Sequence, residues 1–145
     1  MICVPIKSDD ESILVKQLLQ VQKNSFVDVV ELWLDELNVI PIKINKIKEK
    51  PFIYKSIGNI KKIKIILGKL RIDYIDLDIS ANSVIRKYIR KHHPKLKIIG
   101  SFHDYKKTPD INTLKKIASK IDKSGADIIK ISTHANHLTD SMRML

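Results

Sequence analysis

Short apolar runs alternate along the whole chain with longer segments in which apolar residues recur at helical spacing. The runs predict strands and the longer segments predict helices, because side chains alternate across a strand but repeat every three to four residues on a helix. The expected strands cover residues 2–6, 27–34, 51–55, 73–79, 95–103 and 126–132. The expected helices cover residues 9–24, 43–49, 60–70, 82–93 and 111–125, with a last helix from about residue 136.

Local features set the expected helix boundaries. Ser8 precedes an acidic first turn and is expected to cap the first helix. Pro94 and Gly125 are expected to end helices, and the segment Thr108-Pro109-Asp110 is expected to begin one.

Strands that alternate with helices indicate parallel pairing and right-handed crossovers. About six such units fit in 145 residues, whereas a complete (β/α)8 barrel takes about 250 residues. The pattern fits either an open doubly wound sheet or part of a barrel. No glycine-rich nucleotide-binding motif follows the first strand, which counts against a nucleotide-binding sheet. The sequence therefore predicts one α/β domain over residues 1–145.

Lysine dominates the charge of the chain, with 23 lysines against 4 arginines and a formal net charge of +11. Proteins that bind nucleic acids usually concentrate arginine and aromatic residues on one face. Here the lysines are spread along the chain together with many isoleucines, as a compositional bias of the genome would produce. We therefore expect no nucleic-acid partner, and a basic nucleic-acid-binding module is the less favoured alternative. An anionic small molecule would also suit the charge.

The single cysteine and the absence of long apolar runs indicate where the protein works. Cys3 has no partner for a disulfide, and no apolar run approaches the ~20 residues that span a bilayer. No signal peptide is visible at the N-terminus. We expect a cytoplasmic protein with no membrane partner.

Candidate functional residues follow from the ends of the expected strands, because active sites of parallel α/β folds lie at the carboxyl ends. A histidine and a lysine at neighbouring strand ends suit Schiff-base chemistry, provided that burial or nearby positive charge lowers the pKa of the lysine. A chance lysine or a histidine that only caps a turn would look the same. The residues at these ends are Glu31, Trp33, Lys55, Asp76, Asp78, His103 and Lys130.

The remaining histidines do not predict a metal site. His134 and His137 have a spacing that suits a metal ion, but no carboxylate accompanies them. We expect them to be surface residues and expect no metal ligand in the chain.

Ordered motifs in the chain resemble those of type I 3-dehydroquinate dehydratases. The segment IIGSFHDYKKTP (98–109) is similar to the stretch around the catalytic histidine of that family, and GADIIKIS (125–132) is similar to the stretch around its Schiff-base lysine. MICVPI at the start, VVELWLD (29–35) and DYIDLDI (73–79) match further motifs in the same order.

The resemblance implies a (β/α)8 TIM-barrel type of fold, here incomplete with about six units. It implies that Lys130 forms an imine with 3-dehydroquinate and that His103 moves protons during loss of water to give 3-dehydroshikimate. It also implies that Glu31 contacts the substrate hydroxyls, and it places Trp33 and Lys55 at substrate-binding positions. The reaction needs no cofactor, and it lies on the route to chorismate and the aromatic amino acids.

The chain departs from the family pattern at positions where we expect an effect on activity. Trp33 and Lys55 stand where the family has arginines, and the Glu-Gly-Gly that follows the second arginine is missing. The last two strand–helix units, with the arginine for the substrate carboxylate, are also expected to be missing. We expect a homodimer or larger homo-oligomer, or a complementing C-terminal fragment, to cover the open barrel. A catalytically impaired homologue that keeps the fold is the alternative function.

Overall fold

One parallel sheet runs through residues 1–144, the part of the chain that the computed structural model describes. Its six strands pair in chain order, β1-β2-β3-β4-β5-β6. The strands are β1 (Cys3–Lys7), β2 (Val29–Trp33), β3 (Phe52–Ser56), β4 (Tyr74–Asp78), β5 (Lys97–Asp104) and β6 (Ile128–Thr133). The helices are α1 (Glu11–Gln22), η1 (Leu34–Glu36), η2 (Ile42–Lys46), α2 (Ile60–Lys69), α3 (Ser83–His92), α4 (Ile111–Lys123) and α5 (Leu138–Arg143), in which η marks a 3-10 helix.

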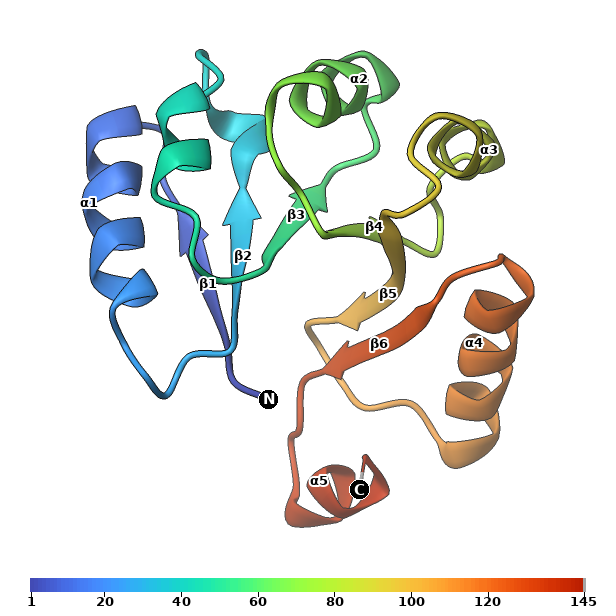
Figure 1. Ribbon diagram of the computed structural model, residues 1–145. Coiled ribbons are helices and arrows are strands. Elements are labelled where there is room, and N and C mark those ends of the chain that lie inside the picture. Colours follow the sequence, from blue (N-terminus) through green and yellow to red (C-terminus); the bar gives the residue numbers. More distant parts are fainter. Residues whose placement is uncertain (145) are drawn as a thin grey trace.

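The sheet curls into an incomplete barrel with the helices on its outer side (Figure 1). Each connection between strands includes a helical segment that returns the chain to the same end of the sheet, as parallel pairing requires. This is the incomplete (β/α)8 architecture that the sequence predicts, and the open doubly wound sheet is excluded by the curl.

The outer face of the sheet carries the main hydrophobic core. Phe52, Tyr54, Ile75 and Leu77 from β3 and β4 are completely buried, together with residues of α1, α2 and α3. These positions alternate along each strand, which gives the helices a continuous apolar surface to pack on. At Gly100 of β5, a β-carbon would lie 2.4 Å from Cγ2 of Ile121, so glycine allows α4 to approach the sheet closely.

The inner face carries the opposite set of alternating residues and is layered along the barrel axis. The strand register pairs Lys55 with Asp76 and Ser101 with Lys130. An apolar floor lies nearer the amino ends of the strands, where Val29, Ile53 and Ile99 form a small cluster against Tyr74. Two positions further along these strands lie the charged residues Glu31, Lys55 and Asp76 and the hydroxyl of Ser101.

The cap of the first helix differs from the sequence analysis. The N-cap of α1 is Asp10, whose side chain accepts hydrogen bonds from the backbone N–H groups of Ser12 and Ile13, so the expected cap at Ser8 is wrong. Ser8 instead binds the backbone of Asp10 in the preceding turn. Asp110 caps α4 as expected, and Gly125 follows α4 with a φ of +79° that favours glycine.

Two other segments differ from the expected helices. The segment expected at 43–49 forms the 3-10 helix η2, and the last helix begins at Leu138 rather than near residue 136. The expected helix ran to the end of the chain, and its last residue, Leu145, lies outside the described residues. No helix within residues 1–144 is both long and apolar enough to cross a membrane.

The two edge strands of the sheet are β1 and β6. Within residues 1–144 each of them pairs with one neighbour only, β2 and β5 respectively. Ile128 and Ile129 of β6 are 39% and 43% exposed, so an edge strand with two apolar faces is left partly uncovered. The unpaired backbone groups and the exposed isoleucines make this edge a surface on which further polypeptide could pair.

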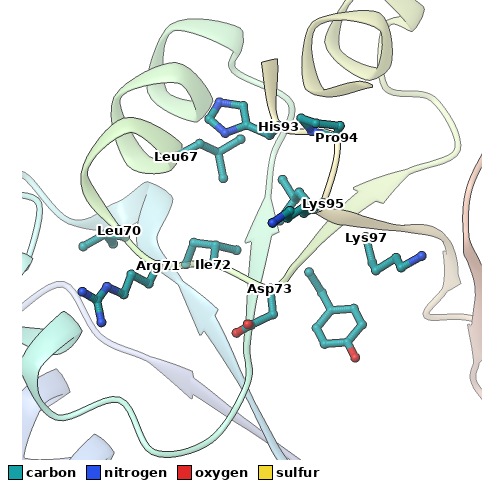
Figure 2. A pocket seen from close by; sticks show the side chains of 11 residues that line it. Leu67, Leu70, Arg71, Ile72, Asp73, His93, Pro94, Lys95 and Lys97 are labelled. Carbon is teal, nitrogen blue, oxygen red and sulfur yellow. The ribbon is translucent and has the colours of Figure 1, made fainter. Parts of the chain in front are cut away.

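A cavity of about 670 Å³ lies at the amino ends of β4 and β5, between the loops that precede these strands. Figure 2 shows Asp73, His93, Lys95 and Lys97 among the side chains that line it. Because sites of this architecture lie at the carboxyl ends of the strands, the cavity is at the end opposite to the candidate site.

Candidate active site

A layer of charged and polar side chains, called the charged layer below, crosses the inner face near the middle of the strands. Each member comes from a different strand, and alternation points all of them into the curl of the sheet. The layer consists of Glu31 (β2), Lys55 (β3), Asp76 (β4), Ser101 (β5) and Lys130 (β6). A cavity of about 470 Å³ lies below Glu31 and Lys130, over the apolar floor of the inner face.

The amine of Lys130 binds two carboxylates. Its Nζ donates to Oε2 of Glu31 at 2.7 Å and to Oδ2 of Asp76 at 2.9 Å. The Lys130 side chain is 36% exposed, whereas Asp76 is completely buried. The lysine is therefore reachable from solvent, while the carboxylate that binds it is fixed inside the sheet.

Trp33 acts on the site through Glu31. Its indole Nε1 donates to Oε1 of Glu31 at 3.0 Å, leaving Oε2 for Lys130. The ammonium of Lys7 lies 5.1 Å from the centre of the Trp33 ring, within the range of a cation–π contact. The sequence-predicted residues Glu31, Trp33 and Lys130 are thus brought together in one chain of contacts.

Asp76 links Lys130 to Lys55. Oδ1 of Asp76 accepts from Nζ of Lys55 at 2.8 Å and from the Ser101 hydroxyl at 2.5 Å. Burial would raise the pKa of Asp76, but the hydrogen bonds from Lys55, Ser101 and Lys130 outweigh burial and lower it. Asp76 is therefore an anion that two lysines share.

His103 lies one layer further toward the carboxyl end of β5. It shares the inner face with Ser101, two residues before it, and its ring stacks on Tyr105 with centroids 5.9 Å apart. Burial, followed by the positive charge of Lys55, lowers the pKa of His103 below its ordinary value of 6.5. The imidazole is therefore neutral near pH 7 and able to accept a proton.

The protonation state of Lys130 differs from the expectation. Burial would lower the pKa of its amine, but the hydrogen bonds to Glu31 and Asp76 outweigh burial and raise the pKa. Schiff-base chemistry requires a lowered pKa of the lysine, and this unliganded state does not meet that condition because two carboxylates, which could not be assigned to Lys130 from the sequence, bind the amine. Attack on a carbonyl requires that the ammonium first lose a proton.

Two members of the layer were not predicted as functional residues. Asp76 was among the strand-end residues but was given no catalytic or binding role, and Ser101 was missed. The signal for Ser101 is its spacing of two residues from His103, which places both side chains on one face of a strand. Asp78, at the end of β4, accepts from the backbone and hydroxyl of Ser80 and is not part of the charged layer.

The layer contains amines beside carboxylates rather than a cage of metal ligands. Within residues 1–144, no group of three or more His, Cys, Asp or Glu side chains lies close enough to hold a metal ion. The arrangement presents an amine and an imidazole from neighbouring strands, beside carboxylates that accept hydrogen bonds.

Solved structures with the same architecture are type I dehydroquinate dehydratase barrels. The enzyme from Clostridium difficile, solved with covalent modified comenic acid, superposes with a TM-score of 0.78 at 20% identity over 98% of this chain and 66% of that one. The 3-dehydroquinate dehydratase from Aquifex aeolicus superposes with a TM-score of 0.75 at 24% identity, over 99% and 72% of the two chains. These similarities establish the barrel fold.

Sequence comparisons establish the family. The profile described as Type I 3-dehydroquinase matches residues 59–145. A 3-dehydroquinate dehydratase of Methanococcus maripaludis (strain C6) is 30% identical over all of this chain, which covers 72% of that protein. The bifunctional 3-dehydroquinate dehydratase/shikimate dehydrogenase of Arabidopsis thaliana is 29% identical over 99% of this chain, which covers 27% of that protein. The chain belongs to the type I 3-dehydroquinase family.

Proposed function

We propose that this chain carries the Schiff-base site of a 3-dehydroquinate dehydratase, with Lys130 as the amine and His103 as the acid–base group. The observation that supports this most directly is that Lys130 lies on the inner face of β6, one layer beyond the apolar floor toward the carboxyl ends, beside the strand that bears His103. The neutral imidazole and the neighbouring carboxylate Glu31 support the same assignment.

The proposed reaction proceeds in balanced steps. The neutral amine of Lys130 adds to the C3 ketone of 3-dehydroquinate, and loss of one water gives an imine. His103 removes a proton from the adjacent carbon, the electron pair shifts toward the imine, and the C1 hydroxyl then leaves as water with a proton from His103. Addition of one water to the imine releases 3-dehydroshikimate and restores the amine, so the net change is loss of one water.

The other predicted residues have binding roles in this proposal. Glu31 contacts substrate hydroxyls once its hydrogen bond with Lys130 opens. Lys55 supplies a cation near the substrate, although an ammonium lacks the planar bidentate geometry of an arginine. Trp33 orients Glu31 with a neutral N–H where the family has a second cation.

We propose further that the open edges β1 and β6 are covered by additional polypeptide in the active protein. The edge strands, each with a single paired neighbour among residues 1–144, and the exposed Ile128 and Ile129 support this step. A second copy of the chain and a complementing segment that supplies strands are the two sources, and the mass of the assembly in solution distinguishes them. Relatives joined to a shikimate dehydrogenase show that this barrel also exists beside other domains.

A second candidate function is a homologue that binds the substrate without turning it over. The specific observation in its favour is the resting state of Lys130, an ammonium bound by Glu31 and Asp76. Trp33 also stands where the family has an arginine, so the site lacks that positive charge. The two candidates predict different outcomes with the substrate.

The test is the intact mass of the protein after incubation with 3-dehydroquinate and borohydride. We expect a reduced adduct of one substrate per chain in the wild type and none in Lys130→Ala. Lys48→Ala is the matched control, because Lys48 is also a partly buried lysine paired with a carboxylate, at 2.7 Å from Asp73, but lies outside the charged layer.

The outcomes separate the candidates. An adduct that persists in Lys130→Ala contradicts the assignment of the amine. A folded wild type that forms no adduct, yet binds 3-dehydroquinate in calorimetry, supports the second candidate. An adduct with release of 3-dehydroshikimate in the absence of borohydride supports the enzyme.

A further inference from the structure

Asp76 divides its charge between two lysines. Its Oδ1 binds Lys55 at 2.8 Å and its Oδ2 binds Lys130 at 2.9 Å, and the carboxylate itself has no exposure to solvent. A buried carboxylate with no access to water depends on these donors for its stabilisation. The single negative charge of Asp76 is therefore shared, and the more strongly one lysine binds it, the less it stabilises the charge of the other.

Lys55 is positioned to be the permanent partner. Its side chain is 12% exposed, against 36% for Lys130, and its register position on β3 is directly opposite Asp76 on β4. The Ser101 hydroxyl adds a neutral donor to the same Oδ1. Lys130 alone of the two lysines also binds a second carboxylate, the buried Glu31.

We propose that Lys55 is a positioning residue for the Lys130 amine: by neutralising Asp76 from the β3 side, it leaves Lys130 free to release its proton and attack a carbonyl. The inference rests on the covalent role proposed above for Lys130. It concerns the charge of Lys55 in the unliganded site and is separate from any contact of Lys55 with substrate.

The charge balance of the layer shows in which direction Lys55 shifts the protonation of Lys130. Two lysines face two carboxylates, so the network of Lys55, Asp76, Lys130 and Glu31 is neutral overall. Without the Lys55 charge, one lysine would face two carboxylates, which favours the ammonium form of Lys130. The titratable groups that act on this amine from the neighbouring strands are Cys3 of β1, Glu31 of β2, Lys55 of β3, Asp76 of β4 and His103 of β5.

The test measures the Lys130 amine without 3-dehydroquinate. Reductive methylation with formaldehyde and cyanoborohydride proceeds through the free amine, and peptide mapping reports each lysine separately. The rate at Lys130 is divided by the rate at the exposed Lys123 of the same chain and followed from about pH 6 to pH 11, around the ordinary lysine value of about 10.4. The ratio removes any effect of pH on the reagents.

The variants separate charge from structure. In Lys55→Gln, which keeps a hydrogen-bond donor, we expect the Lys130 midpoint to move to higher pH and its relative rate at pH 8 to fall about threefold or more. Lys55→Arg keeps the charge and should stay near the wild type. Ser101→Ala removes a neutral donor from the same oxygen and should move the midpoint less than Lys55→Gln does. Unchanged melting curves show that each variant is folded.

Two results would overturn the inference. One is a Lys55→Gln midpoint that stays in place or moves to lower pH in a folded protein. The other is a Ser101→Ala shift as large as that of Lys55→Gln, because the number of donors on Asp76 would then matter rather than the charge of Lys55. Methylation that behaves as expected, with no 3-dehydroquinate adduct, would count against the proposed function alone.

Discussion

The two faces of the same sheet are built on different physical principles. On the outer face, Phe52, Tyr54 and Leu77 are buried among apolar side chains of the helices. On the inner face, Lys55 and Asp76 of the same two strands are buried against charges. Neighbouring residues in the chain, such as Phe52 and Ile53, therefore belong to different environments.

The difference matters for what each face tolerates. An apolar core is a sum of many interchangeable contacts, so its members can be replaced by residues of similar volume. Each charge of the inner layer has only a few specific partners, so the removal of a single member leaves a buried charge with fewer hydrogen bonds. Stability should therefore depend mainly on the outer face, and activity on the inner face.

The largest expected effect is on turnover, at His103. His103→Gln should lower the rate of dehydration about 10²- to 10⁴-fold, the usual contribution of a positioned acid–base group. The fold should be unaffected, and borohydride trapping at Lys130 should persist at a reduced rate. The rate of product formation measures turnover, and the adduct mass after borohydride measures trapping at Lys130. An equal loss of trapping and turnover with a lowered melting temperature would show a structural role instead.

The pH profile of turnover sharpens the same prediction. Burial and the charge of Lys55 lower the pKa of His103, so the base stays neutral, and active, to below pH 6.5. We expect the acidic limb of the wild-type rate to lie below that value. A limb that lies above pH 6.5 would contradict the role of His103 as the proton acceptor.

Substitutions at two neighbouring positions of β3 test whether the outer face contributes more to stability than the inner face. Phe52→Ala should reduce the free energy of unfolding by about 3–5 kcal/mol, because a fully buried ring leaves a cavity in the main core. Ile53→Ala should cost about 2 kcal/mol, at the low end for isoleucine, because Ile53 borders a cavity on the inner face. Denaturant unfolding of both variants measures the difference, and equal losses would remove the distinction between the faces.

The outer face was also the more predictable one. Alternation and helical periodicity in the sequence predict all six strands to within a few residues, since these patterns depend on local spacing alone. The cap of the first helix was misassigned to Ser8, two residues before Asp10, because both residue types are good caps and the sequence does not say which one turns the chain.

The inner layer depends on long-range register, which the sequence does not display. Lys130 and Glu31 are in contact although they lie 99 residues apart in the chain. The motifs indicated His103, Lys130 and Glu31, but not the carboxylate that Lys130 shares with Lys55, and so the raised pKa of Lys130 could not be predicted. The face of the strand on which a residue lies could be predicted from alternation. Its charge partners could not, because they depend on how the curl of the sheet brings distant strands together.

A smaller effect is expected at the centre of the layer. Asp76→Asn should reduce the free energy of unfolding by about 3 kcal/mol at neutral pH, because two lysines lose their shared anion. Since the pKa of Asp76 is lowered by folding, the carboxylate stabilises the fold above its ordinary value of 3.8 and loses that contribution as the pH falls through the folded value. The variant should therefore lose less stability than the wild type on acidification. A pH dependence identical to that of the wild type would show that Asp76 is not an anion in the folded protein.

The smallest expected effect lies at the end of the network, where Trp33 meets solvent. Trp33→Phe keeps an aromatic ring for Lys7 but removes the N–H that binds Glu31. Because this donor is neutral and the ring is only half-buried, the loss in unfolding free energy should be about 1 kcal/mol. With Oε1 of Glu31 unbound, the carboxylate can rotate toward Lys130 and favour its ammonium form, so adduct formation should slow more than stability falls. Trapping rates and melting curves of the wild type and of Trp33→Phe compare the loss of adduct formation with the loss of stability. An equal change in the two would mean that Trp33 only fills space. A selective change would show that even the outermost link of the inner layer acts on the amine, in contrast to a peripheral residue of the outer core.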